Sequence, residues 1–210
     1  MLTRSALAHR IAALAALACL LAVAAPVAAE SRDEWQQPDR VLADLNLKAG
    51  WTVADVGCGP GYLTFRLAKA VGEGGKVMAQ DIDKGALKAV ADKARKEKVD
   101  QVETVAGEGA DTKLKAASLD AALMCDVIHE VPDAQKAPLI KSVAEAVKPG
   151  GYFFLIDYRK SHDVKFDPYE KLIPHDDLVK LATDAGLVLD AEFHYLKYQV
   201  FFRFRKPLKP

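Results

Sequence analysis

The stretch that decides the fold reads Val53-Ala54-Asp55-Val56-Gly57-Cys58-Gly59-Pro60-Gly61. A short run rich in β-branched residues leads into it and a segment with helical periodicity follows, so it predicts a turn from a strand into a helix. Glycines in such a turn let the backbone approach a ligand closely, at the strand end where α/β sheets bind ligands. The pattern therefore predicts a cofactor loop.

The spacing within this loop selects the kind of cofactor. Loops that bind the pyrophosphate of nicotinamide dinucleotides read G-x-G-x-x-G. This loop reads D-x-G-x-G-x-G, with its third glycine one residue earlier and with Asp55 two residues before the first glycine. A carboxylate at that position favours a cofactor with a cationic ammonium group and no phosphate, such as S-adenosylmethionine.

Beyond the loop, strands and helices alternate, which is typical of an α/β fold with a largely parallel sheet. The pattern predicts strands at 51–56, 76–81, 101–106, 119–125 and 152–158, and helices at 38–48, 61–71, 84–97, 133–147 and 175–185. The helix at 133–147 is expected to stop at the turn Lys148-Pro149-Gly150-Gly151. Only two residues separate the last strands, 187–195 and 198–205, so they predict an antiparallel hairpin. The expected fold class is α/β, with a Rossmann-like, seven-stranded, mostly parallel sheet that ends in this hairpin.

The glycine loop resembles motif I of class I S-adenosylmethionine-dependent methyltransferases. Further likeness lies in Asp81 at the end of the second strand, in Gly107–Asp111, in Ser118–Glu130 and in Val147–Gly151. It covers about residues 38–158, whereas the C-terminal part matches in architecture only. The resemblance implies S-adenosylmethionine as cofactor and methyl transfer to a small-molecule acceptor. The sequence lacks the Asn-Pro-Pro-Tyr or Asp-Pro-Pro-Tyr signature of enzymes that methylate amide or exocyclic amino nitrogens.

The resemblance also implies which residues bind the cofactor. They follow the first four strands: Asp55, Gly57, Cys58, Gly59, Gly61, Asp81, Ile82, Glu108, Gly109, Asp111 and Asp126. Asp81 matches the acid that accepts both ribose hydroxyls, whereas Asp83 is better placed to cap the next helix. Glu108 and Asp111 are alternatives for the contact with the adenine amino group.

Methyl transfer from a sulfonium chiefly requires orientation, and a base helps when the acceptor is a hydroxyl or a protonated amine. The expected catalytic residues are His129 and Glu130, beyond the fourth strand, and Tyr158, at the end of the fifth. Asp157 and His162 lie on the same rim of the sheet. No metal ion is expected.

The first 29 residues differ from the rest of the chain. Arg4 and Arg10 precede an apolar run at 11–25. Val27-Ala28-Ala29 then supplies small residues where a signal peptidase cuts. We therefore expect a signal peptide at 1–29 and a methyltransferase domain at 30–210. The exported protein would be periplasmic or secreted, with no stable membrane association after cleavage. An uncleaved N-terminal membrane anchor is the alternative.

Composition limits the other functions. Lys+Arg and Asp+Glu are each 29, so the chain has no formal net charge, which argues against a dedicated nucleic-acid-binding protein. Three cysteines are too few for a disulfide framework, and Cys58 and Cys125 are expected to be buried thiols near the site, with a disulfide as the alternative. Because S-adenosylmethionine is made in the cytosol, a non-catalytic binding domain is the main rival. The glycine spacing argues against a third possibility, a nicotinamide-dependent oxidoreductase. The sequence leaves the oligomeric state open.

Overall fold

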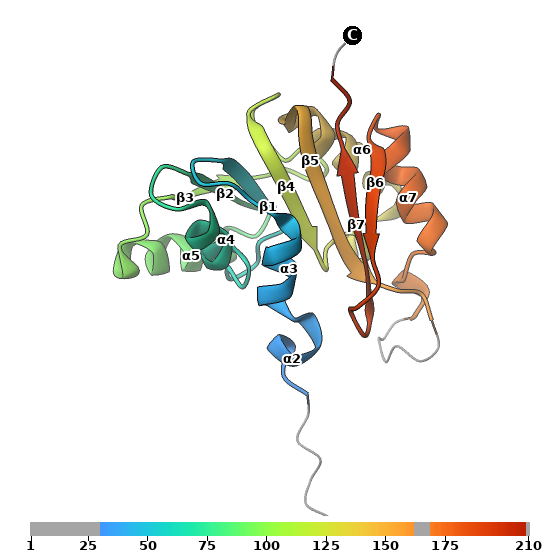
Figure 1. Ribbon diagram of the computed structural model, residues 1–210, viewed down its shortest axis with the longest axis horizontal. Coiled ribbons are helices and arrows are strands. Elements are labelled where there is room, and N and C mark those ends of the chain that lie inside the picture. The colour runs from blue at the N-terminus through green and yellow to red at the C-terminus, as the bar shows by residue number, and fades with distance from the viewer. Residues whose placement is uncertain (1–29, 162–168, 209–210) are drawn as a thin grey trace, which may run out of the picture. The chain divides into compact units, whose positions relative to one another are not determined.

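A computed structural model describes residues 30–161 and 169–208 of the chain, and Figure 1 shows their arrangement. One compact unit runs from Arg32 to Pro210. The expected signal peptide at 1–29 and His162 lie outside the described residues. Among the described helices, none has the length and apolar character that crossing a membrane requires.

The core of the unit is one seven-stranded sheet with the order β3-β2-β1-β4-β5-β7-β6. The strands are β1 (Thr52–Val56), β2 (Lys76–Asp81), β3 (Val102–Ala106), β4 (Leu119–Cys125), β5 (Val147–Tyr158), β6 (Val188–Phe193) and β7 (Gln199–Arg205). The first five strands pair in parallel, whereas β7 is antiparallel to both β5 and β6. Six strands therefore point one way and β7 the other, which confirms the Rossmann-like sheet with its antiparallel hairpin.

Helices cover both faces of the sheet (Figure 1). They are α2 (Arg32–Gln36), α3 (Pro38–Leu45), α4 (Thr64–Val71), α5 (Lys84–Glu97), α6 (Asp133–Ala146) and α7 (His175–Asp184), with short 3-10 helices η1 (Ile128–Glu130) and η2 (Tyr169–Lys171). Alternate residues of β4 enter different clusters, because successive strand side chains point to opposite faces. Ala122 and Met124 pack with α6 and α7, while Ala121 and Leu123 pack with α3 and α4.

The segment Lys148–Gly151, expected as a turn, is instead the start of β5. The pairing with β4 shifts there, from Leu119↔Val147 to Ala121↔Tyr152, so that β5 carries extra residues in a bulge. Lys206 holds this bulge: its Nζ donates to the carbonyls of Ala144 and Val147 at 2.7 Å each, and its backbone exchanges hydrogen bonds with Gly150 and Gly151. These partners lie more than fifty residues away along the chain, so local turn residues did not indicate them.

Several other boundaries differ from expectation. Helix α3 ends at Leu45 instead of residue 48. Strand β6 ends two residues earlier and β7 begins one residue later than predicted, so residues 194–198 connect them rather than two residues. Helix α4 begins at Thr64 instead of residue 61, because the glycine loop continues to Leu63. The short helices α2, η1 and η2 have too few residues for a periodic signal.

The fully buried Phe153 tests the central packing. Its ring stacks on Phe204 at 6.1 Å between centroids. We expect Phe153→Ala to lower the free energy of unfolding by about 3–5 kcal/mol, because it removes a large side chain and leaves a cavity. Urea denaturation measures this loss. Val188→Ala is the control, since Val188 is 56% exposed and its truncation should change stability by less than about 0.5 kcal/mol. Equal effects of the two substitutions would contradict the packing.

Candidate functional site

The glycine loop between β1 and α4 is held against the end of β2. The backbone N–H groups of Gly57 and Cys58 both donate to the carbonyl of Gln80, at 2.8 and 3.0 Å. Gly57, Gly59 and Gly61 all have positive φ angles, of 69°, 50° and 89°. A Cβ at Gly57 would lie 2.4 Å from Val127 Cγ2, whereas a Cβ at Gly59 would meet nothing within 4 Å. Gly57 therefore allows close packing, while Gly59 borders open space.

Asp55 lies under this loop and is almost fully buried. Its Oδ2 accepts a hydrogen bond of 2.6 Å from Thr64 Oγ1. Burial raises the pKa of Asp55 to about 6, against the hydrogen bond of Thr64 and the charge of Arg32, which lower it. Asp55 lines a cavity, which we name the glycine-loop cavity, with these residues: Arg32, Gly57, Cys58, Gly59, Pro60, Tyr62, Leu63, Cys125 and Asp126.

Asp81 ends β2 and connects it to the glycine loop. Its Oδ2 accepts from the backbone N–H of Gly59 at 2.8 Å, and its Oδ1 accepts from that of Asp83 at 2.9 Å. Asp83 in turn accepts from the N–H groups of Gly85 and Ala86, so it caps α5 as expected. The carboxylate of Asp81 is thereby fixed in direction.

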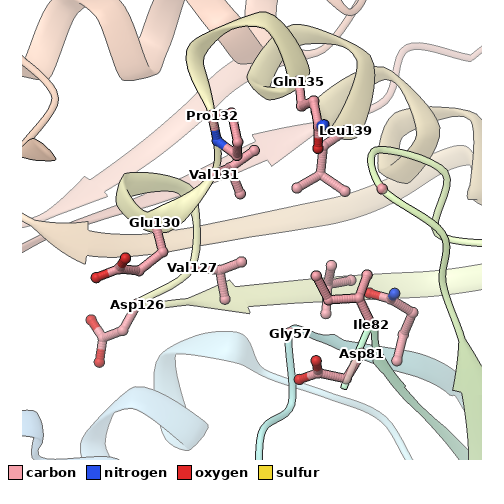
Figure 2. A pocket seen from close by; sticks show the side chains of 13 residues that line it. Gly57, Asp81, Ile82, Asp126, Val127, Glu130, Val131, Pro132, Gln135 and Leu139 are labelled. Carbon is pink, nitrogen blue, oxygen red and sulfur yellow. The ribbon is translucent and has the colours of Figure 1, made fainter. Parts of the chain in front are cut away.

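Asp81 and its exposed neighbour Ile82 line a second cavity, which we name the β2–β4 cavity (Figure 2). The other lining residues are Val56, Gly57, Gln80, Gly109, Asp126, Val127, Glu130, Val131, Pro132, Gln135 and Leu139. Figure 2 shows the aliphatic side chains of Val131 and Leu139 on one wall and Asp126 and Glu130 toward one end. Both cavities share Gly57 and Asp126, so they adjoin one another at the carboxyl ends of the strands, and we call the two together the groove.

Glu108 and Asp111, the two alternatives for the contact with adenine, do not line this groove. Glu108 and Asp111 both turn toward Lys113, at 3.5 and 2.7 Å, and pair with each other through their backbones. The hydrogen bond and charge of Lys113 hold the pKa of Asp111 below its usual range. Only Gly109 of that loop lines the β2–β4 cavity. The amide side chains of Gln80 and Gln135 line it instead, and no sequence motif singled them out.

Asp126 stands where the two cavities meet. It follows β4 with a φ of 59°, an uncommon backbone conformation for a residue with a side chain. Its Oδ2 pairs with Arg32 at 3.0 Å and its Oδ1 accepts from Gln199. Burial and the nearby Asp157 raise the pKa of Asp126 to about 6, although Arg32 acts to lower it.

The expected catalytic residues lie next to one another beyond β4 and β5. His129 is buried, its Nδ1 lies 2.6 Å from Asp157 Oδ1, and its ring meets the edge of Tyr158 at 5.4 Å. Glu130 lies 3.5 Å from His129 Nε2, half-exposed, and pairs with Lys171. Burial acts to lower the pKa of His129, but the hydrogen bond and charge of Asp157, with the charges of Glu130 and Asp126, outweigh it and raise the pKa. Burial raises the pKa of Tyr158 to about 12.

The two cysteines near the site are free thiols in the structure. Cys58 packs against Ala79, Leu87 and Val90, whereas Cys125 belongs to the cluster of α3 and α4. Burial raises the pKa of both thiols, which makes them poor nucleophiles.

Comparison with known proteins agrees with this geometry. A family model described as a methyltransferase domain matches residues 53–151. A demethylmenaquinone methyltransferase from Oceanobacillus iheyensis is 31% identical over 113 residues, which are 54% of this chain and 47% of that relative. The chloroplastic 2-phytyl-1,4-beta-naphthoquinone methyltransferase of Arabidopsis thaliana is 30% identical over 157 residues, which are 73% of this chain and 58% of that relative.

A solved structure, a SAM-dependent methyltransferase from Aquifex aeolicus, superposes with a TM-score of 0.77 at 28% identity, over 84% of this chain and 93% of that one. The chain spans about half the length of the curated relatives it matches. The sheet order, the glycine loop and these similarities support a class I S-adenosylmethionine-dependent methyltransferase. S-adenosylmethionine is the cofactor of that class of enzyme.

The buried carboxylate of Asp55 generates a pH-dependent prediction. Its pKa is higher in the fold than the ordinary 3.8, so the fold binds its proton more tightly than the unfolded chain does. Ionisation of Asp55 therefore lowers the free energy of unfolding progressively as pH rises from about 4 to about 6, and the full loss persists at higher pH. We expect Asp55→Asn to stabilise the protein by about 1–3 kcal/mol at pH 8 and by much less at pH 4.

Urea denaturation at the two pH values measures this difference. Asp100→Asn, at an exposed position, is the matched control and should show no such gain. A gain for Asp55→Asn that is the same at both pH values would show that charge burial is not its cause.

Proposed function

We propose that the protein transfers a methyl group from S-adenosylmethionine to a small-molecule acceptor. One observation carries the proposal: the β2–β4 cavity with Asp81 and the glycine-loop cavity with Asp55 meet at Asp126, and Glu130 of the first cavity lies 3.5 Å from Nε2 of His129. The two parts of the groove differ in chemistry. The β2–β4 cavity has aliphatic walls that suit a flat base, and the glycine-loop cavity has carboxylates that suit an ammonium group.

The residues present fit the cofactor. Asp81, with a fixed carboxylate, would accept the two ribose hydroxyls, and Ile82 would cover one face of the adenine. Gly57 and Gly59 would admit the methionine portion close to the backbone, where Asp55 and Asp126 face its ammonium. When bound, the cofactor supplies a methyl group on a sulfonium, which is an activated leaving group. The chain supplies orientation and a base.

His129 is the proposed base. The short contact with Asp157 holds its ring, and the net acidic surroundings raise its pKa. A base whose pKa is close to the working pH accepts a proton from an acceptor hydroxyl efficiently. Glu130 and Tyr158 flank the ring, and we propose that they orient the acceptor rather than accept its proton, because Glu130 is engaged by Lys171 and the pKa of Tyr158 is about 12.

We propose an aromatic hydroxyl compound, such as a hydroquinone, as the class of acceptor. The names of the two curated relatives refer to naphthoquinone-type compounds. The ring of Trp35 in α2 lies 6.0 Å from that of Tyr158 and 6.1 Å from that of Tyr198, and the ring of Tyr158 lies 5.4 Å from that of His129. Such rings favour a flat, apolar acceptor. Nucleic acid is not part of this proposal.

We further propose that the protein acts outside the cytosol. The basic start, apolar run and small residues of 1–29 support export, and the alternative of an N-terminal anchor would give the same side of the membrane. Fractionation of cells that make the full chain, followed by mass spectrometry of its N-terminus, tests this directly. A protein found only in the cytosol with residue 1 or 2 first would contradict export.

Asp81 provides the first test of the cofactor site. We expect Asp81→Ala to weaken binding of S-adenosylhomocysteine about tenfold to a hundredfold, because hydrogen bonds to a charged group are lost. Calorimetric titration measures the affinity. Asp83→Asn is the control: an asparagine still caps a helix, so binding should stay at the wild-type level. Equal affinity for wild type and Asp81→Ala would remove Asp81 from the site.

His129 provides the test of catalysis. We expect His129→Ala to lower the rate of methyl transfer from labelled S-adenosylmethionine to a hydroquinone by about 10²–10⁴-fold, the usual contribution of a general base. Affinity for S-adenosylhomocysteine should change less than about threefold. The control is His194→Ala, at a histidine with a mostly exposed side chain. Cofactor binding without transfer to any hydroquinone or other small acceptor would favour the non-catalytic binding domain.

A further inference from the structure

We infer that Asp157 is a positioning residue for His129: it fixes both the backbone of η1 and the tautomer of the ring, so that Nε2 is the basic nitrogen. This inference rests on the proposed function, in which His129 accepts a proton. It concerns a residue of β5 that lies outside the cofactor groove and that no motif of the glycine loop or of β4 includes.

Asp157 is nearly fully buried, 1% exposed, near the end of an otherwise apolar strand. Four donors surround its carboxylate. Oδ2 accepts from the backbone N–H groups of Ile128 at 3.0 Å and His129 at 3.4 Å, while Oδ1 accepts from that of Tyr158 at 2.7 Å. The fourth donor is His129 Nδ1, at 2.6 Å from Oδ1. Hydrogen bonds to a carboxylate are stronger than those between neutral groups, so these four donors hold the Asp157 side chain in one position.

An ionised carboxylate only accepts hydrogen bonds, so the contact requires that Nδ1 carry a proton. In the neutral imidazole, the other nitrogen then has the lone pair. That nitrogen, Nε2, lies on the side of the ring that faces Glu130, whose Oε1 is 3.5 Å away. Because Glu130 lines the β2–β4 cavity, Asp157 directs the basic nitrogen of His129 toward the groove and away from the sheet.

The same carboxylate also holds the segment that carries the base. By accepting from Ile128 and His129, it satisfies N–H groups in the first turn of η1, a helix of three residues that cannot satisfy them itself. Backbone and side chain of His129 are therefore fixed by one group. Removing this acid alone would leave these buried donors without an acceptor, so its loss should also lower stability.

The charged and titratable groups that face His129 come from several elements. Asp157 and Tyr158 belong to β5, Glu130 to η1, and Asp126 follows β4. Asp157 accepts a hydrogen bond from the ring at Nδ1. Removing the charge of Asp157 should therefore change the pKa of His129 more than removing a charge at an exposed position of the same region.

The first experiment is nitrogen-15 NMR of the full chain with labelled histidine, above the pH at which the ring of His129 titrates. His129→Gln identifies its signals among the five histidines. We expect the neutral ring of His129 to carry its proton on Nδ1. A proton on Nε2 would overturn the inference, and this measurement needs no variant of Asp157.

The second experiment compares Asp157→Asn with wild type in folded samples. We expect the pKa of His129 to fall by about one unit or more, since a charged partner within hydrogen-bond distance is lost. The rise of methyl-transfer rate with pH should move to lower pH by the same amount. Asp133→Asn, which removes an exposed charge at the start of α6, should leave the titration unchanged. An unchanged His129 pKa in Asp157→Asn would overturn the inference.

These readouts separate the inference from the function on which it rests. An Nδ1–H tautomer and a lowered pKa in Asp157→Asn would support the positioning role even if no methyl transfer were detected, and the proposed function would then fail alone. Methyl transfer by a protein with the Nε2–H tautomer would support the function and refute the role of Asp157.

Discussion

Parallel pairing of β2, β1, β4 and β5 is the constraint on which the rest of the site depends. Parallel strands end at the same edge of a sheet, so the last residues of neighbouring strands lie side by side along that edge. The glycine loop, Asp81, Asp126 and the His129–Asp157 pair occupy successive positions along that edge. No other arrangement of these segments would place residues from four separate parts of the chain beside one groove.

This edge concentrates carboxylates that the fold would be more stable without. Asp55 and Asp126 have pKa values raised to about 6 by burial, and Asp126 also has a positive φ. Perturbed acids and an unusual backbone conformation tend to gather at functional sites, where the arrangement serves binding or chemistry rather than stability. Asp157 differs from these two, because four donors surround it. The site therefore combines two buried acids with raised pKa values in the groove and one acid outside it, Asp157, that accepts four hydrogen bonds.

Much of the fold could be predicted from the sequence, because its signals are local. Strand and helix alternation gave β2, β4 and α5 with their observed bounds, and the short link before β7 indicated an antiparallel hairpin. What could not be predicted depends on contacts distant in sequence. Lys206 holds Lys148–Gly151 in strand, and Lys113 pairs with Glu108 and Asp111, neither of which lines the two cavities. Asp157 was expected only as a residue on the rim, because its link to His129 exists only once β4 and β5 are paired.

We expect one cofactor molecule to occupy both cavities, from Asp81 to the glycine loop. The decisive measurement is a crystal structure of the protein with S-adenosylhomocysteine. The ribose hydroxyls should lie on Asp81, the amino-acid portion against Gly57 and Gly59, and the sulfur on the side of Asp126 and His129. Adenosylhomocysteine bound elsewhere, or cavities closed to it in a folded protein, would show that the groove is not the cofactor site.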